Sequence, residues 1–183
     1  MASTSTAPTN TDTRDPAAPP DGATAALVLA SGEIVWGTGI GAAGTATGEV
    51  CFNTSITGYQ EILTDPSYAG QIITFTFPHV GNVGANPEDI ETTTPAARGL
   101  ILRGDITHPS NWRAAQHLND WLTSHSLTGI AGVDTRRLTR LIRDSGAPTG
   151  VIHHAPDGTF DIPALSATAT AWPGLEGMDL AKE

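Results

Sequence analysis

The stretch GEVCFNTSITGYQEILTDPSYAGQIITFTFPHVGNVG, residues 48–84, decides the fold because it places two β-strand patterns on either side of a short helix. The first strand pattern covers residues 48–53 and the second covers residues 71–77. In the second pattern Ile73 and Phe75 share one face, and β-branched residues fill the other. A strand of this kind is typical of the centre of a sheet.

The segment between these two strands predicts a helix followed by a turn. Thr57 and Gln60 have the spacing of a capping box, in which each side chain binds the other residue's backbone N–H group, so we expect a helix to begin there. The helix has to end before Pro66, because proline disfavours helical geometry in the preceding residue. Residues 65–68, Asp-Pro-Ser-Tyr, are therefore expected to form a turn.

Two further strands are expected before this stretch. The apolar run at residues 25–29 is followed by a Ser-Gly pair and by residues 33–36, which together predict a hairpin. Gly39, Gly41 and Gly44 then match the spacing G-x-G-x-x-G of dinucleotide-binding loops. That function requires the glycines to open a helix, whereas a strand follows here, so we interpret them as a turn between strands.

Strands alternate with helices in the second half of the chain. Residues 99–103 and 129–133 predict strands, and Ser110 can cap a helix between them. The apolar residues of that helix are Ala114, Leu118, Trp121 and Leu122. A second helix would begin at Asp134 or Thr135. This alternation predicts parallel pairing of the strands.

These patterns predict an α/β fold in which an antiparallel sheet is stacked on a mixed or parallel sheet with helices. Residues 1–24 are almost wholly small and polar, with too little apolar surface to offset the entropy of ordering, so we expect a disordered leader. The folded domain would span residues 25–155. Residues 156–183 are rich in Pro, Gly, Ala and Thr and are interpreted as a linker.

The composition disfavours several classes of function. Nine Lys and Arg against 19 Asp and Glu give a net charge of −10. Such an acidic surface repels phosphate backbones and anionic lipids, so neither nucleic acid nor a membrane is an expected partner. The single cysteine cannot form an internal disulfide, and we find neither a secretion signal nor an apolar run long enough for a membrane span. We therefore expect a cytoplasmic protein.

Cys51 is the only candidate for a cysteine nucleophile, and its surroundings disfavour that role. It lies within an apolar strand, without a base or a signal for a lowered pKa, so we interpret it as a packing residue. The histidines include His79 and the adjacent pair His153 and His154, which point to opposite sides of a strand and cannot readily share one ion. We therefore assign no catalytic residue and no metal site to this chain.

A concentration of positive charge stands out in this acidic chain. Arg136, Arg137, Arg140 and Arg143 are four of its nine basic residues, on a helix expected to end at Gly146. Arg136, Arg140 and Arg143 share the face opposite the apolar residues of that helix. They form either the solvated face of an amphipathic helix or a docking surface for an acidic partner.

Long stretches of the sequence resemble one known family. Residues 48–84 and residues 131–152, AGVDTRRLTRLIRDSGAPTGVI, resemble the N-terminal domain of the small chain of glutamine-dependent carbamoyl-phosphate synthase. Residues 37–44 and 173–183, PGLEGMDLAKE, extend the likeness, which begins at Leu27. The resemblance implies a swivelling β/β/α domain that packs against the large subunit and against a class I glutamine amidotransferase domain, which would begin where this chain stops.

The resemblance also implies which chain carries out each step. In the family, a cysteine–histidine–glutamate triad of the second domain hydrolyses glutamine, and ammonia passes to the large subunit. The large subunit uses ATP and Mg²⁺ to make carbamoyl phosphate from bicarbonate for arginine and pyrimidine biosynthesis. The family's glutamine site takes one residue from the N-terminal domain, the serine of the Asp-Pro-Ser-Tyr turn, which matches Ser67. From the residues alone, Ser67 could also serve only to close its own turn.

We therefore expect a domain that docks to the large subunit in a heterodimer, contributes Ser67 to glutamine binding, holds no cofactor and is inactive alone. Arg136, Arg140 and Arg143 are the expected contact with that partner. An alternative is a stand-alone interaction module that binds the large subunit without catalysis. A third interpretation, an independent hydrolase built on Cys51, is disfavoured by the surroundings of that residue.

Overall fold

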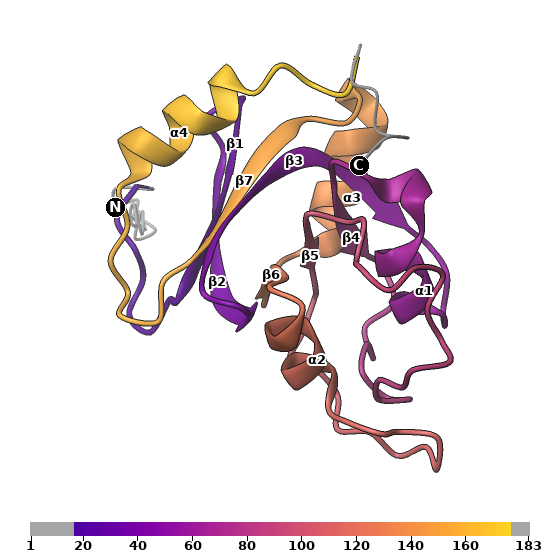
Figure 1. Ribbon diagram of the computed structural model, residues 1–183. Helices are drawn as coiled ribbons and strands as arrows, with labels where there is room; N and C mark the ends of the chain where they lie inside the picture. The colour runs from indigo at the N-terminus through magenta and orange to yellow at the C-terminus, as the bar shows by residue number, and fades with distance from the viewer. Residues whose placement is uncertain (1–16, 177–183) are drawn as a thin grey trace, which may run out of the picture.

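Seven strands form one sheet that closes into a barrel in the computed structural model, which describes residues 17–176 (Figure 1). The strands are β1 (Ala25–Leu29), β2 (Ile34–Gly41), β3 (Gly44–Asn53), β4 (Gln71–Phe75), β5 (Gly99–Ile101), β6 (Thr128–Ala131) and β7 (Thr149–His154). The helices are α1 (Tyr59–Thr64), the 3₁₀ helix η1 (Pro66–Tyr68), α2 (Leu118–Ser124), α3 (Thr135–Ser145) and α4 (Ile162–Ala171). Around the barrel the strands follow the order β1-β2-β6-β5-β4-β3-β7.

The sheet is mixed. β3, β4, β5 and β6 pair in parallel with their neighbours in that series, whereas β1 pairs antiparallel with β2 and β7, and β7 with β3. An antiparallel pairing of β2 with β6 closes the barrel. The expected α/β class and the parallel pairing are confirmed. The sheet, however, is one closed barrel, whereas we expected two stacked sheets.

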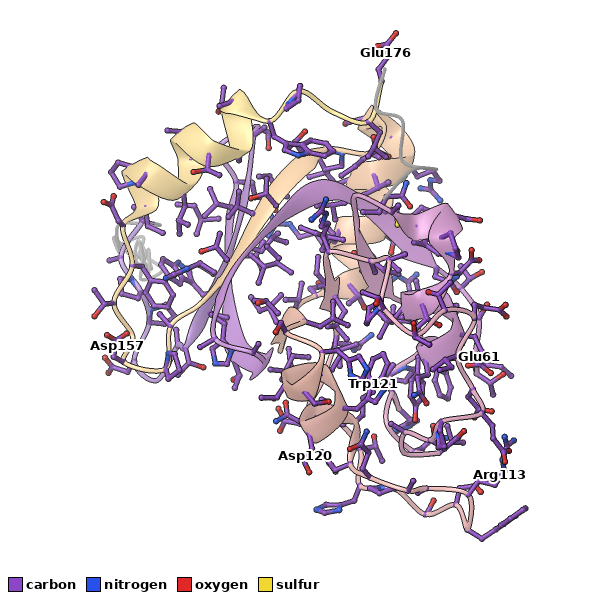
Figure 2. The ribbon with its side chains drawn as sticks, viewed as in Figure 1. Glu61, Arg113, Asp120, Trp121, Asp157 and Glu176 are labelled. Carbon is purple, nitrogen blue, oxygen red and sulfur yellow. The ribbon has the colours of Figure 1, made fainter. Side chains whose placement is uncertain are left out.

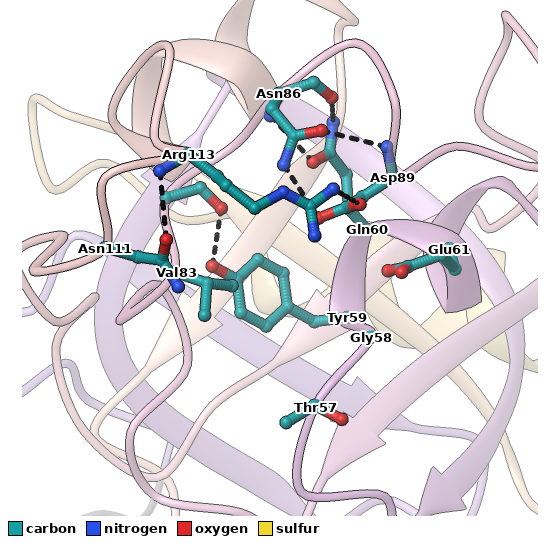
Figure 3. A pocket seen from close by; sticks show the side chains of 11 residues that line it. Thr57, Gly58, Tyr59, Gln60, Glu61, Val83, Asn86, Asp89, Asn111 and Arg113 are labelled. Carbon is teal, nitrogen blue, oxygen red and sulfur yellow. Dashed lines mark hydrogen bonds and ion pairs between the residues drawn. The ribbon is translucent and has the colours of Figure 1, made fainter.

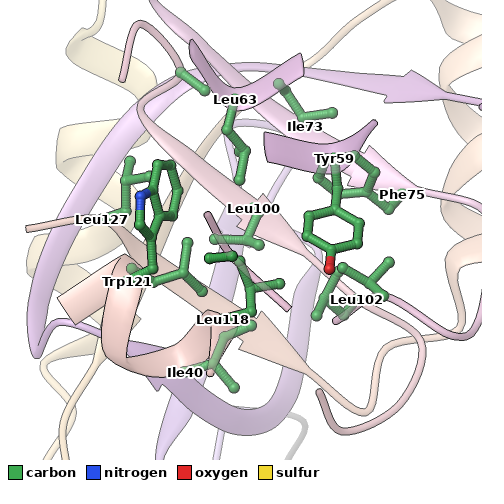
Figure 4. Packing of buried hydrophobic residues seen from close by; sticks show 14 of the residues in the cluster. Ile40, Tyr59, Leu63, Ile73, Phe75, Leu100, Leu102, Leu118, Trp121 and Leu127 are labelled. Carbon is green, nitrogen blue, oxygen red and sulfur yellow. The ribbon is translucent and has the colours of Figure 1, made fainter. Parts of the chain in front are cut away.

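Three apolar clusters hold the fold together. All seven strands contribute to the first cluster, which is therefore the barrel interior, and Leu138 and Ile142 of α3 pack onto it. The second lies outside the parallel strands and is covered by α1 and α2, with Trp121 and Leu63 packed over Leu100 (Figure 4). The third joins α4 to β1 and β7. The barrel is thus covered by helices on separate sides (Figure 1).

Most of the expected elements are present. β1 covers the residues predicted, and β4 is central between β3 and β5. The Asp134 side chain caps α3 by accepting a hydrogen bond from the backbone N–H of Arg137 at 3.0 Å, and the helix ends at Gly146 as expected. The predicted glycine-rich turn is shorter than expected: β2 runs through Gly39 to Gly41 and β3 begins at Gly44, and both Gly41 and Gly44, which flank the turn, adopt positive φ.

Two predicted helix caps are wrong. α1 begins after Gly58 without a side-chain cap, because the predicted capping residue Gln60 binds the backbone of Asn86 instead. The helix expected to follow Ser110 begins only at Leu118, with His117 as its cap. Residues 110–116 are held outside the helix by bonds to a neighbouring connection, including an isolated bridge between Ala85 and Gln116.

The segments on either side of the expected domain carry ordered elements. Thr24, at the end of the expected leader, accepts a hydrogen bond from the N–H of Gly39 at 2.8 Å through its hydroxyl. Residues 156–183, ascribed above to a linker, include α4, whose Leu165 and Ala169 are buried against the barrel. Residues 1–16 of the leader and 177–183 of the linker lie outside the described residues.

Close packing inside the barrel yields the first prediction. A Cβ at Gly150 would lie 2.7 Å from a methyl group of Val50 and 3.1 Å from one of Leu29. Gly150→Ala should therefore lower the free energy of unfolding by about 1–3 kcal/mol, as overpacked cores do. Gly104→Ala is the control, because nothing lies within 4 Å of its added Cβ. Denaturant unfolding that leaves both variants equal to wild type would contradict this account of the interior.

Candidate functional site

The turn that carries Ser67 is fixed by its neighbours. Asp65 caps η1, because one of its carboxylate oxygens accepts a hydrogen bond from the backbone N–H of Ser67 at 2.8 Å. Behind the turn, the Tyr68 hydroxyl accepts a hydrogen bond from the side-chain amide of Asn53 at 2.9 Å. Pro66 restricts the backbone between them. Ser67 itself is exposed, so its hydroxyl is held on a rigid turn and is accessible to another molecule or domain.

A broad groove of about 980 Å³ lies beside this turn. Its lining comes from the start of β3, from the connections that lead into β4, β5 and β6, and from the residue after α4. The lining includes Thr45, Pro66, Gly70, Thr94, Arg98, Thr128 and Trp172. The groove therefore lies at the end of the barrel where the parallel strands begin. Since Trp172 forms part of its wall, the chain passes this groove as it leaves α4.

The exposed arginines of α3 lie on one side of that helix. Arg136, Arg140 and Arg143 are exposed, whereas the apolar residues on the opposite side are buried. Arg143 lies 3.4 Å from the carboxylate of Asp144, but both groups are about two-thirds exposed, and such pairs contribute little energy. Within the described part of the chain, no ion pair involves Arg136 or Arg140. The helix thus presents positive charge that can meet an acidic surface.

Cys51 lies on β3 with its side chain against the outer apolar cluster. Burial, with a smaller contribution from the nearby carboxylate of Glu49, raises the pKa of this thiol to about 11. The nucleophilic thiolate is therefore scarce at neutral pH. This agrees with the interpretation of Cys51 as a packing residue.

His153 and His154 each have a hydrogen-bonding partner of their own. His153 Nδ1 lies 2.8 Å from the hydroxyl of Thr45, and His154 Nδ1 lies 3.2 Å from the carbonyl oxygen of Ala42. Between residues 17 and 176, no three His, Cys, Asp or Glu side chains gather in a way that could hold a metal ion. Over the same range, no helix is long and apolar enough to cross a bilayer.

A smaller cavity of about 240 Å³ contains a polar network that sequence reasoning missed (Figure 3). The Gln60 side chain donates to the carbonyl of Asn86 at 2.8 Å and accepts from its N–H at 3.0 Å. Asp89 accepts from the side chain of Asn86 at 2.7 Å and pairs with Arg113 at 2.6 Å. Burial raises the pKa of Tyr59, whose hydroxyl donates to the carbonyl of Gly84. The cavity walls are therefore held in place by internal bonds.

Comparison with known proteins identifies the family. The family model of carbamoyl-phosphate synthase small chain, CPSase domain, matches residues 27–152. The chain belongs to this family. The carbamoyl phosphate synthase small chain of Rhizobium meliloti (strain 1021) is 63% identical over 163 residues, which cover 87% of this chain and 41% of that protein. The small chain of Bradyrhizobium diazoefficiens is 61% identical over 170 residues, 91% of this chain and 43% of the relative.

This chain spans about two fifths of the curated small chains that it matches. The matched region contains all of the barrel except the first residues of β1 and the last of β7, together with the turn that carries Ser67 and the arginine helix α3. The predicted membership of the carbamoyl-phosphate synthase small chain family is thus confirmed. The roles of Ser67, Arg136, Arg140 and Arg143 stay predictions, and the structure places Ser67 on a different connection from the three arginines.

The surroundings of Cys51 yield the second prediction. A thiol-specific reagent should modify native Cys51 much more slowly than Cys51 in the chemically unfolded chain, because burial keeps the thiol protonated. The pKa of an ordinary thiol is 9.0, whereas that of Cys51 in the folded chain is about 11. As pH rises through this range, the thiol of the unfolded chain ionises first. The free energy of unfolding should therefore fall over this range. Mass-spectrometric labelling measures the first effect. Equal labelling rates for the native and unfolded chain would contradict the assignment.

Proposed function

We propose that this chain is the domain of carbamoyl-phosphate synthase that docks the small chain to the large subunit and contributes to its glutamine site. The observation that carries the proposal is the position of Ser67, on a rigid, exposed turn beside the groove that Trp172 lines. A glutaminase domain that follows this chain would occupy the groove. Its glutamine would then lie within reach of the Ser67 hydroxyl.

Ser67 is suited to binding glutamine without taking part in bond cleavage. A serine hydroxyl can donate a hydrogen bond to the carboxylate of the substrate or accept one from its ammonium group. Because Asp65 already binds the Ser67 N–H, the turn does not need that hydroxyl for its own closure. Ser67 would therefore orient the substrate, while the nucleophile comes from the glutaminase domain. The inert environment of Cys51 supports this division.

In this proposal the chain alone makes no carbamoyl phosphate. The holoenzyme forms it in the cytoplasm from glutamine, bicarbonate and ATP, for arginine and pyrimidine biosynthesis, and the large subunit holds ATP and Mg²⁺. The two sectors of the barrel, antiparallel β1, β2 and β7 and parallel β4, β5 and β6, correspond to the two layers of a swivelling β/β/α domain. The α3 arginines bind an acidic surface of the large subunit.

The second candidate function is a stand-alone module that binds the large subunit without catalysis. The observation that favours it is the exposed arginine face of α3, which suits docking whether or not a glutamine site is formed. Both candidates require docking to the large subunit, but only the first requires Ser67 to affect glutamine use.

The third prediction tests Ser67 in the small chain assembled with the large subunit. Ser67→Ala should raise the KM for glutamine by roughly fivefold to tenfold, since one hydrogen bond to the substrate is worth about 1–1.5 kcal/mol. Synthesis from added ammonia should be unchanged, because ammonia bypasses the glutamine site. Ser55→Ala is the matched control, an exposed serine on the same connection between β3 and β4. An unchanged KM in Ser67→Ala would contradict the role in substrate binding.

The fourth prediction concerns the arginine helix. Substituting Arg136, Arg140 and Arg143 with glutamine should weaken binding of the large subunit by about tenfold or more at low salt and by less at high salt, because screening weakens contacts between charges. The melting temperature should change little, because the three side chains are exposed. Binding to an immobilised large subunit measures the effect.

The control for that experiment carries the same change in net charge on another helix. The control variant replaces Ala164, Ala167 and Thr168 with glutamate; all three are exposed on α4. These substitutions also make the chain more negative by three charges. If this control and the arginine variant weaken binding equally, net charge alone is responsible. If neither weakens it, α3 is merely a solvated face.

A further inference from the structure

The described residues expose two large apolar side chains, and both flank the cavity of Figure 3. Ile56 is 67% exposed and Trp112 is 92% exposed. Thr57, Asn111 and Arg113 line the cavity. Ile56 comes directly before Thr57 in the chain, and Trp112 lies between the other two. Single exposed apolar residues are common on soluble proteins. Two of them next to residues that line one concave polar surface are typical of an interaction site.

The connection that carries Trp112 is held in place although it is long. The N–H of Ser110 donates to the carbonyl of Asn82 at 3.0 Å, and a bridge joins Gln116 to Ala85. Gly84 allows this approach, because a Cβ there would lie 2.5 Å from that of Ala114. The Trp112 side chain is therefore presented on a braced loop, whose next residue, Arg113, is labelled in Figure 2. Such bracing lowers the entropy lost on binding.

The charge of the cavity indicates the kind of partner. Glu61 and Asp89 line it together with a single guanidinium, that of Arg113. Arg113 is already paired, at 2.6 Å with Asp89 and at 3.4 Å with Glu88. No ion pair reaches Glu61 from residues 17–176. The cavity therefore has an excess of negative charge, which a basic side chain would complement.

We propose that Ile56, the cavity and Trp112 form a second docking surface for the large subunit, which fits a segment presenting a lysine or arginine side chain flanked by apolar residues. The basic side chain enters the cavity beside Glu61, and the apolar residues cover Trp112 and Ile56. This surface differs in sign from the α3 arginines, so the two surfaces would contact chemically different parts of the large subunit. The inference rests on the proposed function, because it takes the large subunit as the partner.

The test measures the affinity of the whole small chain for the large subunit. Trp112→Ala should weaken binding by about tenfold, as exposed aromatic anchors at interfaces do. Its melting temperature should match that of wild type, because Trp112 has almost no contact to lose within the fold. Ile56→Ser should weaken binding in the same direction.

Glu61→Gln tests the charge of the cavity. This variant should bind more weakly at low salt, and its affinity should depend less on salt than that of wild type. Asp157→Asn, on the connection between β7 and α4, removes the same charge far from the cavity and should bind as wild type does (Figure 2).

The outcomes separate this inference from the proposed function. If the wild-type small chain binds the large subunit and the variants at Trp112, Ile56 and Glu61 bind equally well, the second surface is refuted and the proposed function stands. If the wild-type small chain does not bind the large subunit, both are refuted.

Discussion

The parallel pairing of β3, β4, β5 and β6 is the constraint on which the rest of the molecule depends. Parallel neighbours cannot be joined by a tight turn, so each pair requires a connection that returns over the outside of the barrel. These three connections carry α1 with the Ser67 turn, the Asn86 loop, and the Trp112 loop with α2. The apolar cluster beneath them fixes their positions, so the surfaces proposed for Ser67 and Trp112 depend on how the sheet closes.

This arrangement separates the packed apolar interior from the groups that are accessible to a partner. The barrel interior is filled by apolar residues from all seven strands, and the thiol on β3 is packed and protonated at neutral pH. The groups accessible to a partner lie on the periphery: the Ser67 hydroxyl, the α3 guanidinium groups and the Trp112 ring. The backbone that carries these groups is held by hydrogen bonds to neighbouring segments, as the bond from Ser67 N–H to Asp65 and the bridge from Gln116 to Ala85 illustrate. Rigid presentation of this kind suits a domain that positions a substrate or a partner.

The sequence predicted what depends on local patterns. Alternation identified β4, and the spacing of Asp134 and Gly146 identified the ends of α3, because periodicity and capping act over a few residues. The polar cavity was not predicted, because Gln60 and Asn86 are far apart in sequence and come into contact only in the folded chain. For the same reason, Gln60 binds the backbone of Asn86 and does not cap α1 as predicted. Closure of the barrel was missed too, because the pairing of β2 with β6 joins strands far apart in the chain. No local pattern reports such contacts.

In the proposed function this chain supplies shape and contact surfaces, whereas glutamine is cleaved by other protein material. Release of ammonia from glutamine by the homogeneous chain of 183 residues, in parallel with its Cys51→Ala variant, tests that claim most directly. We expect neither protein to release ammonia above the uncatalysed rate across the pH range in which they are folded. Turnover by the wild-type chain that is lost in Cys51→Ala would contradict the account.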